Sequence, residues 1–209
     1  MSKIIIHGGF FSESSTNIET KIAKQQALLR IVKDSYAYLQ NHSALETVVY
    51  AVSQLEDDEL FNAGIGSQIQ SDGKIRMSAS LMDGESQKMS GVINIEEVKN
   101  PIQVAQVLMQ VDDRILGGSG ATNFARKHGF ESFSTEIPQR RAEYEAKLAS
   151  LGTGTVGCVA LDKNGKIAVA TSTGGKGFEI PGRISDSATV AGKYANEFCG
   201  VSLTGVGED

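Results

Sequence analysis

Five segments of the chain are predicted to be helical, and apolar side chains recur at helical spacing in the first two. Two of these segments begin with a capping box, in which a hydroxyl residue at the helix start is followed three positions later by glutamate. The boxes span residues 16–19 and 43–46. The apolar positions that follow them predict one helix to about Leu39 and a second that ends near Leu55. Three more helices are expected, one starting at Asn100-Pro101 and the others over residues 121–128 and 138–148.

Short apolar runs between turn residues predict the strands. Residues 3–6 contain three isoleucines ahead of a histidine and a pair of glycines, and we interpret them as a buried strand. Side chains alternate in character on both sides of Asp72-Gly73, a dipeptide that is typical of tight turns between strands. Residues 68–80 are therefore expected to form a hairpin.

A second hairpin is expected later in the chain. Its arms are the β-branched and small-residue runs 156–162 and 166–172, joined through Asn164-Gly165. One more strand is predicted near residues 201–203. Because helices dominate the first part of the chain and strands the last, the pattern indicates an α+β fold.

The composition is that of one globular domain. A chain of 209 residues is close to the size of a single domain, and 40% hydrophobic residues exclude a disordered chain. No apolar run approaches the roughly 18 residues of a membrane span. A net charge of −5 without a basic cluster argues against nucleic-acid binding. We therefore expect neither a membrane nor a nucleic acid as partner.

The two cysteines, Cys158 and Cys199, are far apart and lack the paired spacing of zinc sites. Three isoleucines near Met1 are too few for the apolar core of a signal peptide. Without an export signal, the two cysteines are expected to be buried, reduced thiols, and we expect a cytoplasmic protein.

Small hydroxyl residues gather at the open end of the second hairpin, where antiparallel pairing brings Thr173 beside Thr155. Threonines favour strands and pair across them, which is a sufficient structural reason for such a cluster. A threonine hydroxyl becomes a nucleophile only when a base lies next to it. Cleavage before Thr155 would supply that base as its own α-amine, whose pKa is about 7.7–8.0. Gly154 suits such a cleavage site, since a residue without Cβ leaves its carbonyl open to attack.

Seven short motifs follow one another along nearly the whole chain. They are HGG at 7–9, LFNAGIG at 60–66, MDG at 82–84, GTVG at 154–157, TSTGG at 171–175, PGR with DS at 181–187 and TGVGE at 204–208. Together they resemble the plant-type L-asparaginase and isoaspartyl peptidase family of N-terminal nucleophile hydrolases. GTVG alone would be a weak signal, but seven motifs in the family order are a strong one.

The resemblance implies a four-layer αββα sandwich that is made as an inactive precursor. Autocleavage between Gly154 and Thr155 would divide the single domain into an α subunit, residues 1–154, and a β subunit that begins at Thr155. Family β subunits continue well past the TGVGE motif, so we expect residues 155–209 to be the start of a longer β subunit. The family commonly assembles as a dimer of αβ heterodimers.

The resemblance also assigns roles to individual residues. Thr155 matches the nucleophile and Thr173 the threonine that orients its hydroxyl. Thr204 and Gly205 match the oxyanion hole, in which one donor is worth roughly 3–4 kcal/mol of transition-state stabilisation.

The substrate contacts implied by the resemblance begin with Arg183 and Asp186, three positions apart. Taken alone, this pair is typical of a solvated surface ion pair. In the family, the arginine binds the substrate α-carboxylate, which a guanidinium matches with two hydrogen bonds, and the aspartate binds the α-ammonium group. Gly205 and Gly207 match glycines whose backbone lies against the substrate, and Asn62 matches a side chain that supports the nucleophile.

Four consecutive acidic residues, 56–59, lie where the second predicted helix ends. A helix C-terminus carries negative partial charge, so this arrangement is locally unfavourable. It indicates either a solvated acidic surface or a cation held by backbone oxygens. The resemblance implies the second, a structural sodium ion bound by the carbonyl groups of Leu55, Glu56, Asp58, Phe61, Ala63 and Ile65. No cofactor is expected for the chemistry itself.

The predicted function is hydrolysis at the β-carbonyl group of L-asparagine and of isoaspartyl dipeptides. Alternatives are a glycosylasparaginase, a taspase-like threonine endopeptidase, or a non-catalytic, uncleaved fragment that serves as an assembly partner. Two departures from the family pattern bear on substrate range. Phe10-Phe11 follows HGG where the family usually has Ala-Gly, and Val206 replaces a threonine in TGVG.

Overall fold

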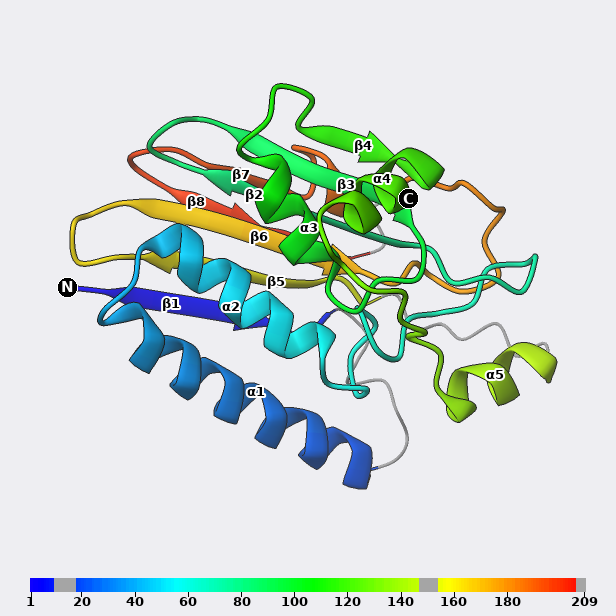
Figure 1. The fold of residues 1–209 in the computed structure, drawn as a ribbon. Helices are drawn as coiled ribbons and strands as arrows, with labels where there is room; N and C mark the ends of the chain where they lie inside the picture. Colours follow the sequence, from blue (N-terminus) through cyan, green and yellow to red (C-terminus); the bar gives the residue numbers. More distant parts are fainter. Residues whose placement is uncertain (10–17, 147–153, 206–209) are drawn as a thin grey trace.

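The computed structural model of the chain describes residues 1–9, 18–146 and 154–205. Figure 1 shows a large mixed sheet with helices packed against it. The strands of this sheet are β1 (Lys3–His7), β2 (Met77–Asp83), β3 (Met89–Ile95), β4 (Ile115–Gly117), β5 (Val156–Leu161) and β6 (Ile167–Thr173). The helices are α1 (Ile18–Leu39), α2 (Ala44–Glu56), α3 (Pro101–Leu108), α4 (Gly118–Lys127) and α5 (Pro138–Glu145).

The six strands lie in the order β1-β5-β6-β2-β3-β4. All neighbouring pairs are antiparallel except β3 with β4, which is parallel. Every residue of the central strand β6 is buried, and the strand reads as a continuous run of small and β-branched residues. That composition is expected where both faces of a strand are covered.

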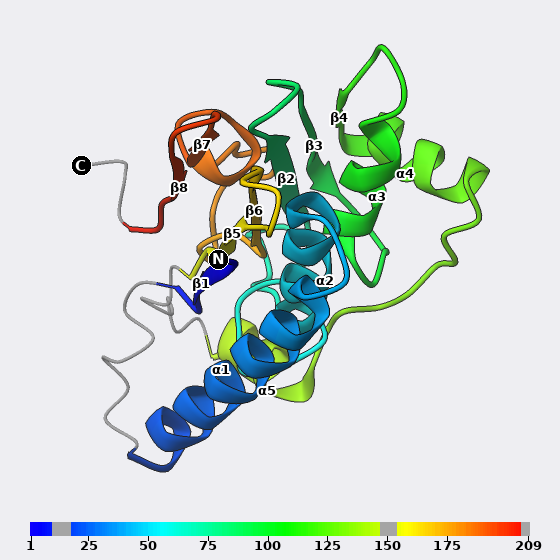
Figure 2. The same cartoon turned by 90° about the vertical axis from the view of Figure 1, so that its left-hand side faces the viewer.

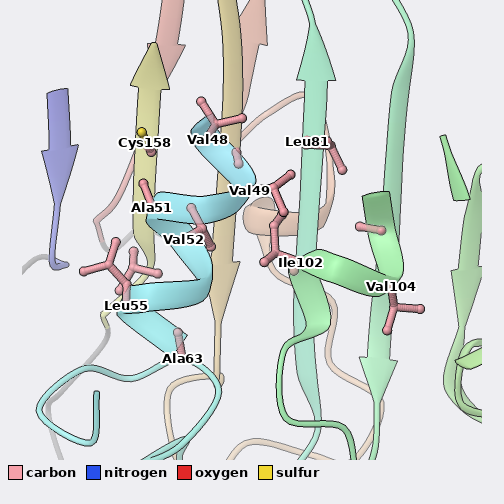
Figure 3. Close-up of a cluster of buried hydrophobic side chains, with 14 of the residues drawn as sticks. Val48, Val49, Ala51, Val52, Leu55, Ala63, Leu81, Ile102, Val104 and Cys158 are labelled. Carbon is pink, nitrogen blue, oxygen red and sulfur yellow. The ribbon is translucent and has the colours of Figure 1, made fainter. Parts of the chain in front are cut away.

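Helices α2 and α3 cover one face of the large sheet. Val48, Val52 and Leu55 of α2 and Ile102 of α3 point from the helices towards the strands, as Figure 3 shows, and all four are fully buried. Each such side chain contributes about 1.5–3 kcal/mol when removed from water. This apolar layer fixes α2, and with it the loop that follows Glu56.

A small sheet covers the opposite face. It consists of β7 (Lys193–Ala195) and β8 (Gly200–Ser202), which contact β6. Figure 2 shows this pair on the side of the large sheet away from α2 and α3. Met82, Ile167, Val169 and Ala195 form the buried cluster between the two sheets. The short 3₁₀ turn η1 (Asp186–Ala188) packs there as well, against β2 and β6.

The mixed helix-and-sheet class expected from the sequence is confirmed. The described residues form three layers, namely helices, large sheet and small sheet, and no second helical layer is found among them. None of the described helices combines the length and the apolar character needed to cross a membrane.

The capping box at the start of α2 forms as predicted. Glu46 N–H donates to Ser43 Oγ at 3.2 Å, and Ser43 N–H donates to Glu46 Oε2 at 2.9 Å. The predicted box at 16–19 falls partly outside the described residues, as does the end of the helix expected to reach residue 148. The fourth helix begins at Gly118, three residues earlier than predicted.

The strand predicted over residues 3–6 forms as β1, but it is not buried. Among the described residues β1 pairs only with β5, and Ile5 is 71% exposed. A second strand prediction is wrong. Residues 68–70 form no strand, although Gln70 N–H donates to the carbonyl of Lys74 across a tight turn. The reason is that β3 and β6 occupy both edges of β2, which leaves no edge for a third partner.

Glu56, the last residue of α2, is completely buried. Its Oε1 accepts hydrogen bonds from Ser172 Oγ at 2.6 Å and from the Ile102 N–H at 3.1 Å, while Oε2 has no partner among the described residues. Burial raises the pKa of this carboxyl to about 8, although the hydrogen bonds from Ser172 and Ile102 act in the opposite direction. Glu56 therefore joins α2 to β6 and α3 as a protonated group at neutral pH.

This burial predicts a pH-dependent stability. The folded protein keeps the Glu56 proton up to about pH 8, whereas the unfolded chain releases it near pH 4.5, so stability falls as pH rises between these values. The slope from this group is at most about 1.4 kcal/mol per pH unit. Urea unfolding at about pH 5 and about pH 7 should show a smaller loss for Glu56→Gln than for the unsubstituted chain. Equal losses in the two proteins would contradict the buried, protonated state.

Candidate active site

A cavity of about 190 Å³ opens where β5 begins and β6 ends. It is lined by Gly154, Thr155, Thr173, Gly175, Lys176, Arg183, Ile184, Ser185, Asp186 and Gly205. Six of these residues are site residues that the sequence predicts, and they come from segments up to 51 positions apart, since 205 − 154 = 51. The structure therefore brings most of the predicted site together.

The meeting of the two threonines follows from strand register. Val156 of β5 lies opposite Ser172 of β6, so Thr155 and Thr173 are the next pair along. Both side chains are nearly buried, with exposed fractions of 9% and 5%. Thr173 Oγ1 accepts a hydrogen bond from the Gly175 N–H at 3.2 Å, which fixes this hydroxyl at the cavity wall.

The hydroxyl of Thr155 has a partner that the sequence analysis missed. Thr155 Oγ1 and Ser187 Oγ lie 2.8 Å apart, and Ser187 Oγ is also 3.4 Å from Asp186 Oδ1. A hydroxyl has one hydrogen to donate. When Ser187 donates to Asp186, the hydrogen between the two hydroxyls must come from Thr155. In the sequence, only the position of Ser187 directly after Asp186 in the same motif could have indicated this contact.

The peptide bond between Gly154 and Thr155 lies against Gly9. Gly9 has φ +103°, and a Cβ there would lie 2.6 Å from the Cα of Gly154. A Cβ on Gly154 would in turn lie 3.4 Å from that of Asn62. The HGG motif thus borders the predicted cleavage site directly.

Asn62 supports the site from behind the cavity wall. Its carbonyl accepts from the Gly174 N–H at 2.8 Å, and its side-chain amide donates to the carbonyl of Gly175. Asn62 Oδ1 accepts from the Gln68 N–H at 3.1 Å. These contacts attach the loop after Thr173 to the loop after α2.

Arg183 and Asp186 reach the cavity from the segment that precedes and opens η1. Gly205 lines the cavity from the segment after β8. Thr204, the other predicted oxyanion residue, is described and half-buried but is not part of the lining. Gly207, Val206 and Phe10-Phe11 lie outside the described residues.

His7 holds β1 against β8. Its Nε2 lies 2.8 Å from Ser202 Oγ, and burial lowers the pKa of the imidazole, an effect that the Thr155 backbone partly offsets. A Cβ on Gly157 would overlap both Ser202 Oγ and His7 Nε2. The second glycine of GTVG is therefore explained by this contact.

The predicted sodium ligands lie at the last two residues of α2 and along the tight loop that follows it. The carbonyl of Glu56 accepts from the Ile65 N–H at 2.7 Å, and that of Asp58 from the Phe61 N–H at 3.1 Å. Gly64 and Gly66 have φ values of +54° and +86°, which turn the backbone inward. Carbonyl oxygens are suitable ligands for a hard cation. Whether these six carbonyls share one ion stays a prediction.

In the structure, three of the four acidic residues 56–59 are paired with a cationic side chain or protonated, so they do not require a bound cation. Asp58 pairs with Arg30 at 2.9 Å, and Asp57 pairs with Lys99 at 2.9 Å. Glu56 is the buried, protonated carboxyl described above. Among the described residues, no cluster of His, Cys, Asp and Glu side chains could hold a metal ion.

The sequence also matches a known family along its length. The family model described as asparaginase covers residues 1–150 and 131–209. The chain belongs to this asparaginase family. The isoaspartyl peptidase/L-asparaginase of Synechocystis sp. is 47% identical over 99% of this chain and 68% of its own length.

Two further relatives of this asparaginase-family chain are more distant. The plant-type L-asparaginase of Pyrococcus furiosus is 37% identical over 100% of the chain and 75% of its own length. The isoaspartyl peptidase of Escherichia coli is 37% identical over 98% of the chain and 71% of its own length. The family resemblance seen in the seven motifs is thus confirmed.

The contact between His7 and Ser202 predicts a stability effect in the asparaginase-family fold. Gly157→Ala places a methyl group into that contact and should lower the free energy of unfolding by about 1–3 kcal/mol. Gly120→Ala is the matched control, since a Cβ there meets nothing within 4 Å and alanine favours a helix. Urea unfolding measures both variants. Equal stability of Gly157→Ala and Gly120→Ala would rule out the proposed clash.

Proposed function

We propose that the protein is a threonine hydrolase that cleaves the β-carbonyl linkage of L-asparagine and of isoaspartyl dipeptides. The observation that carries this proposal is one cavity that joins a buried threonine pair, Thr155 and Thr173, to an arginine and an aspartate, Arg183 and Asp186. The first pair supplies a nucleophile, and the second fits the two charges of an amino-acid zwitterion. The names of the relatives, isoaspartyl peptidase and L-asparaginase, support the same activity.

The first step is cleavage of the chain by its own threonine. The Thr155 hydroxyl attacks the carbonyl carbon of Gly154, the bond from that carbon to the Thr155 nitrogen breaks, and an ester forms. Water then hydrolyses the ester to give the Gly154 carboxylate and a free α-amine on Thr155. The close packing of Gly9 and Asn62 around Gly154 supports this step, because it restricts the peptide to one arrangement.

The freed α-amine then acts as the general base. Its pKa of about 7.7–8.0 lies close to neutral pH, where a general base is most effective. It takes the proton of the Thr155 hydroxyl, whose oxygen attacks the substrate β-carbonyl and expels ammonia or an amine. Water opens the resulting β-aspartyl ester. The Thr204 hydroxyl and the Gly205 N–H stabilise the oxyanion, and the Thr173 hydroxyl orients the nucleophile.

Substrate recognition uses the charged end of the cavity. Arg183 binds the α-carboxylate through two parallel hydrogen bonds, and Asp186 binds the α-ammonium group. The backbone of Gly205, which lines the cavity, would lie against the substrate, and Gly207, outside the described residues, would do the same by the family resemblance. Both substrate classes carry this pair of charges on an aspartyl unit, which explains why one site accepts both.

Two structural features belong to the same proposal. A sodium ion bound by the carbonyls of the loop after α2 would stabilise that loop, which carries Asn62, without taking part in the chemistry. The helices, the large sheet and the β7–β8 pair would be three layers of a four-layer αββα sandwich.

The autocleavage step predicts a hydroxyl requirement at position 155. Thr155→Ala should stay uncut, because no oxygen is left to attack the Gly154 carbonyl. Thr155→Ser is the matched variant, because it keeps the hydroxyl and should still be cut, and intact-mass spectrometry after incubation measures both. Cleavage of Thr155→Ala at the same bond would remove Thr155 from the mechanism.

The binding mode predicts a split between KM and kcat. Arg183→Lys keeps the positive charge but loses the fork that matches a carboxylate, so KM for β-Asp-Leu should rise about 10- to 100-fold with a smaller change in kcat. Arg141→Lys on α5, which is not part of the cavity lining, is the control and should behave like the unsubstituted chain. An unchanged KM for Arg183→Lys would show that the carboxylate binds elsewhere.

A further inference from the structure

One backbone carbonyl beside the cavity receives hydrogen bonds from three separate strands. The carbonyl oxygen of Ser187 accepts from Ser80 Oγ of β2 at 2.6 Å and from Thr171 Oγ1 of β6 at 2.6 Å. It also accepts from Lys193 Nζ of β7 at 2.9 Å. Ser187 is the residue whose own hydroxyl lies 2.8 Å from Thr155 Oγ1. Three donors on one oxygen fix the position of this residue.

Lys193 contacts a second carbonyl of the same turn. Its Nζ donates to the carbonyl of Thr189 at 3.1 Å. Thr189 is in turn attached to the start of the turn, since its N–H and its hydroxyl both donate to the carbonyl of Asp186, at 2.8 Å and 2.9 Å. The amine of Lys193 thus links the carbonyls of Ser187 and Thr189, and Thr189 is itself hydrogen-bonded to Asp186.

Packing alone does not explain a lysine at this place. The Lys193 side chain is 1% exposed, and burial of an ammonium group costs several kcal/mol. Burial lowers the pKa of Lys193 to about 7, and the Asp186 carboxylate offsets part of that effect. A methionine has a similar length and would fill the same space without the cost of a buried charge. What a methionine lacks is the pair of hydrogen bonds to the turn.

We propose that Lys193 is a positioning residue of the active site, whose buried amine ties the Ser187 and Thr189 carbonyls together and thereby holds the Asp186 carboxylate and the Ser187 hydroxyl in place beside Thr155. Lys193 is not part of the cavity lining, so it acts through these two neighbours. This inference deepens the proposed function and rests on it, because the groups it positions are those that bind the substrate ammonium and contact the nucleophile.

Kinetics and stability of one variant separate positioning from packing. Lys193→Met should unfold at the same or a higher temperature, because a buried charge is removed, yet its KM for β-Asp-Leu should rise about 10- to 100-fold. Lys163→Met, in the exposed turn between β5 and β6, is the control and should match the unsubstituted protein in both respects. Unchanged KM and kcat in Lys193→Met would overturn the proposal.

Amide hydrogen exchange tests the same inference without any activity. Lys193→Met should speed exchange at the Thr189 amide and its neighbours in residues 186–189, and leave β5 and β6 as protected as before. If the unsubstituted protein is fully cleaved before Thr155 and yet releases no leucine, the proposed function fails, but this measurement still decides the role of Lys193. Equal exchange in 186–189 with and without the amine would overturn it.

A second variant tests the same carbonyl independently if Lys193→Met destabilises the whole sheet. Thr171→Val keeps the shape of a buried side chain on β6 and removes a different donor from the same Ser187 carbonyl. It should raise exchange in 186–189 and KM in the same direction as Lys193→Met, by a smaller factor. No change in either quantity would show that the Ser187 carbonyl does not position the site.

Discussion

The antiparallel pairing of β5 with β6 is the constraint on which the site depends. It sets Val156 opposite Ser172, and so places the threonine before β5 beside the threonine that ends β6. The pairing is held by cover on both faces, from α2 and α3 on one side and from the β7–β8 pair on the other. A slip of one residue would exchange the β6 side chains that face α2 and α3 with those that face the β7–β8 pair, so the fit of each set to its own cover fixes this register.

Two polar groups that are costly to bury each contact a residue next to one of the predicted site residues. Glu56 bonds to Ser172, the residue before Thr173, and Lys193 bonds to Ser187, the residue after Asp186. Burial shifts their pKa values in opposite directions, up for the carboxyl and down for the amine. Both reduce stability compared with apolar residues and both hold neighbours of the reacting threonine, which is typical of functional sites.

Much of the fold and of the site could be predicted because the sequence patterns that indicate them involve residues close together in the chain. The capping box at Ser43 and the Asn164-Gly165 turn depend on neighbouring residues alone, and the motifs predict most of the cavity lining. The errors concern distant partners. Nothing in residues 68–70 reveals that both edges of β2 are taken, and nothing near Lys193 reveals that its amine meets a carbonyl six positions earlier. Long-range packing decides such features, and local patterns do not record it.

The central claim is that Thr155, once freed by cleavage, attacks a β-aspartyl carbonyl. The most direct measurement is release of leucine from β-Asp-Leu by protein whose mass shows complete cleavage between Gly154 and Thr155. The account predicts equal amounts of leucine and aspartate, formed over many turnovers. Complete cleavage with no leucine released would contradict it.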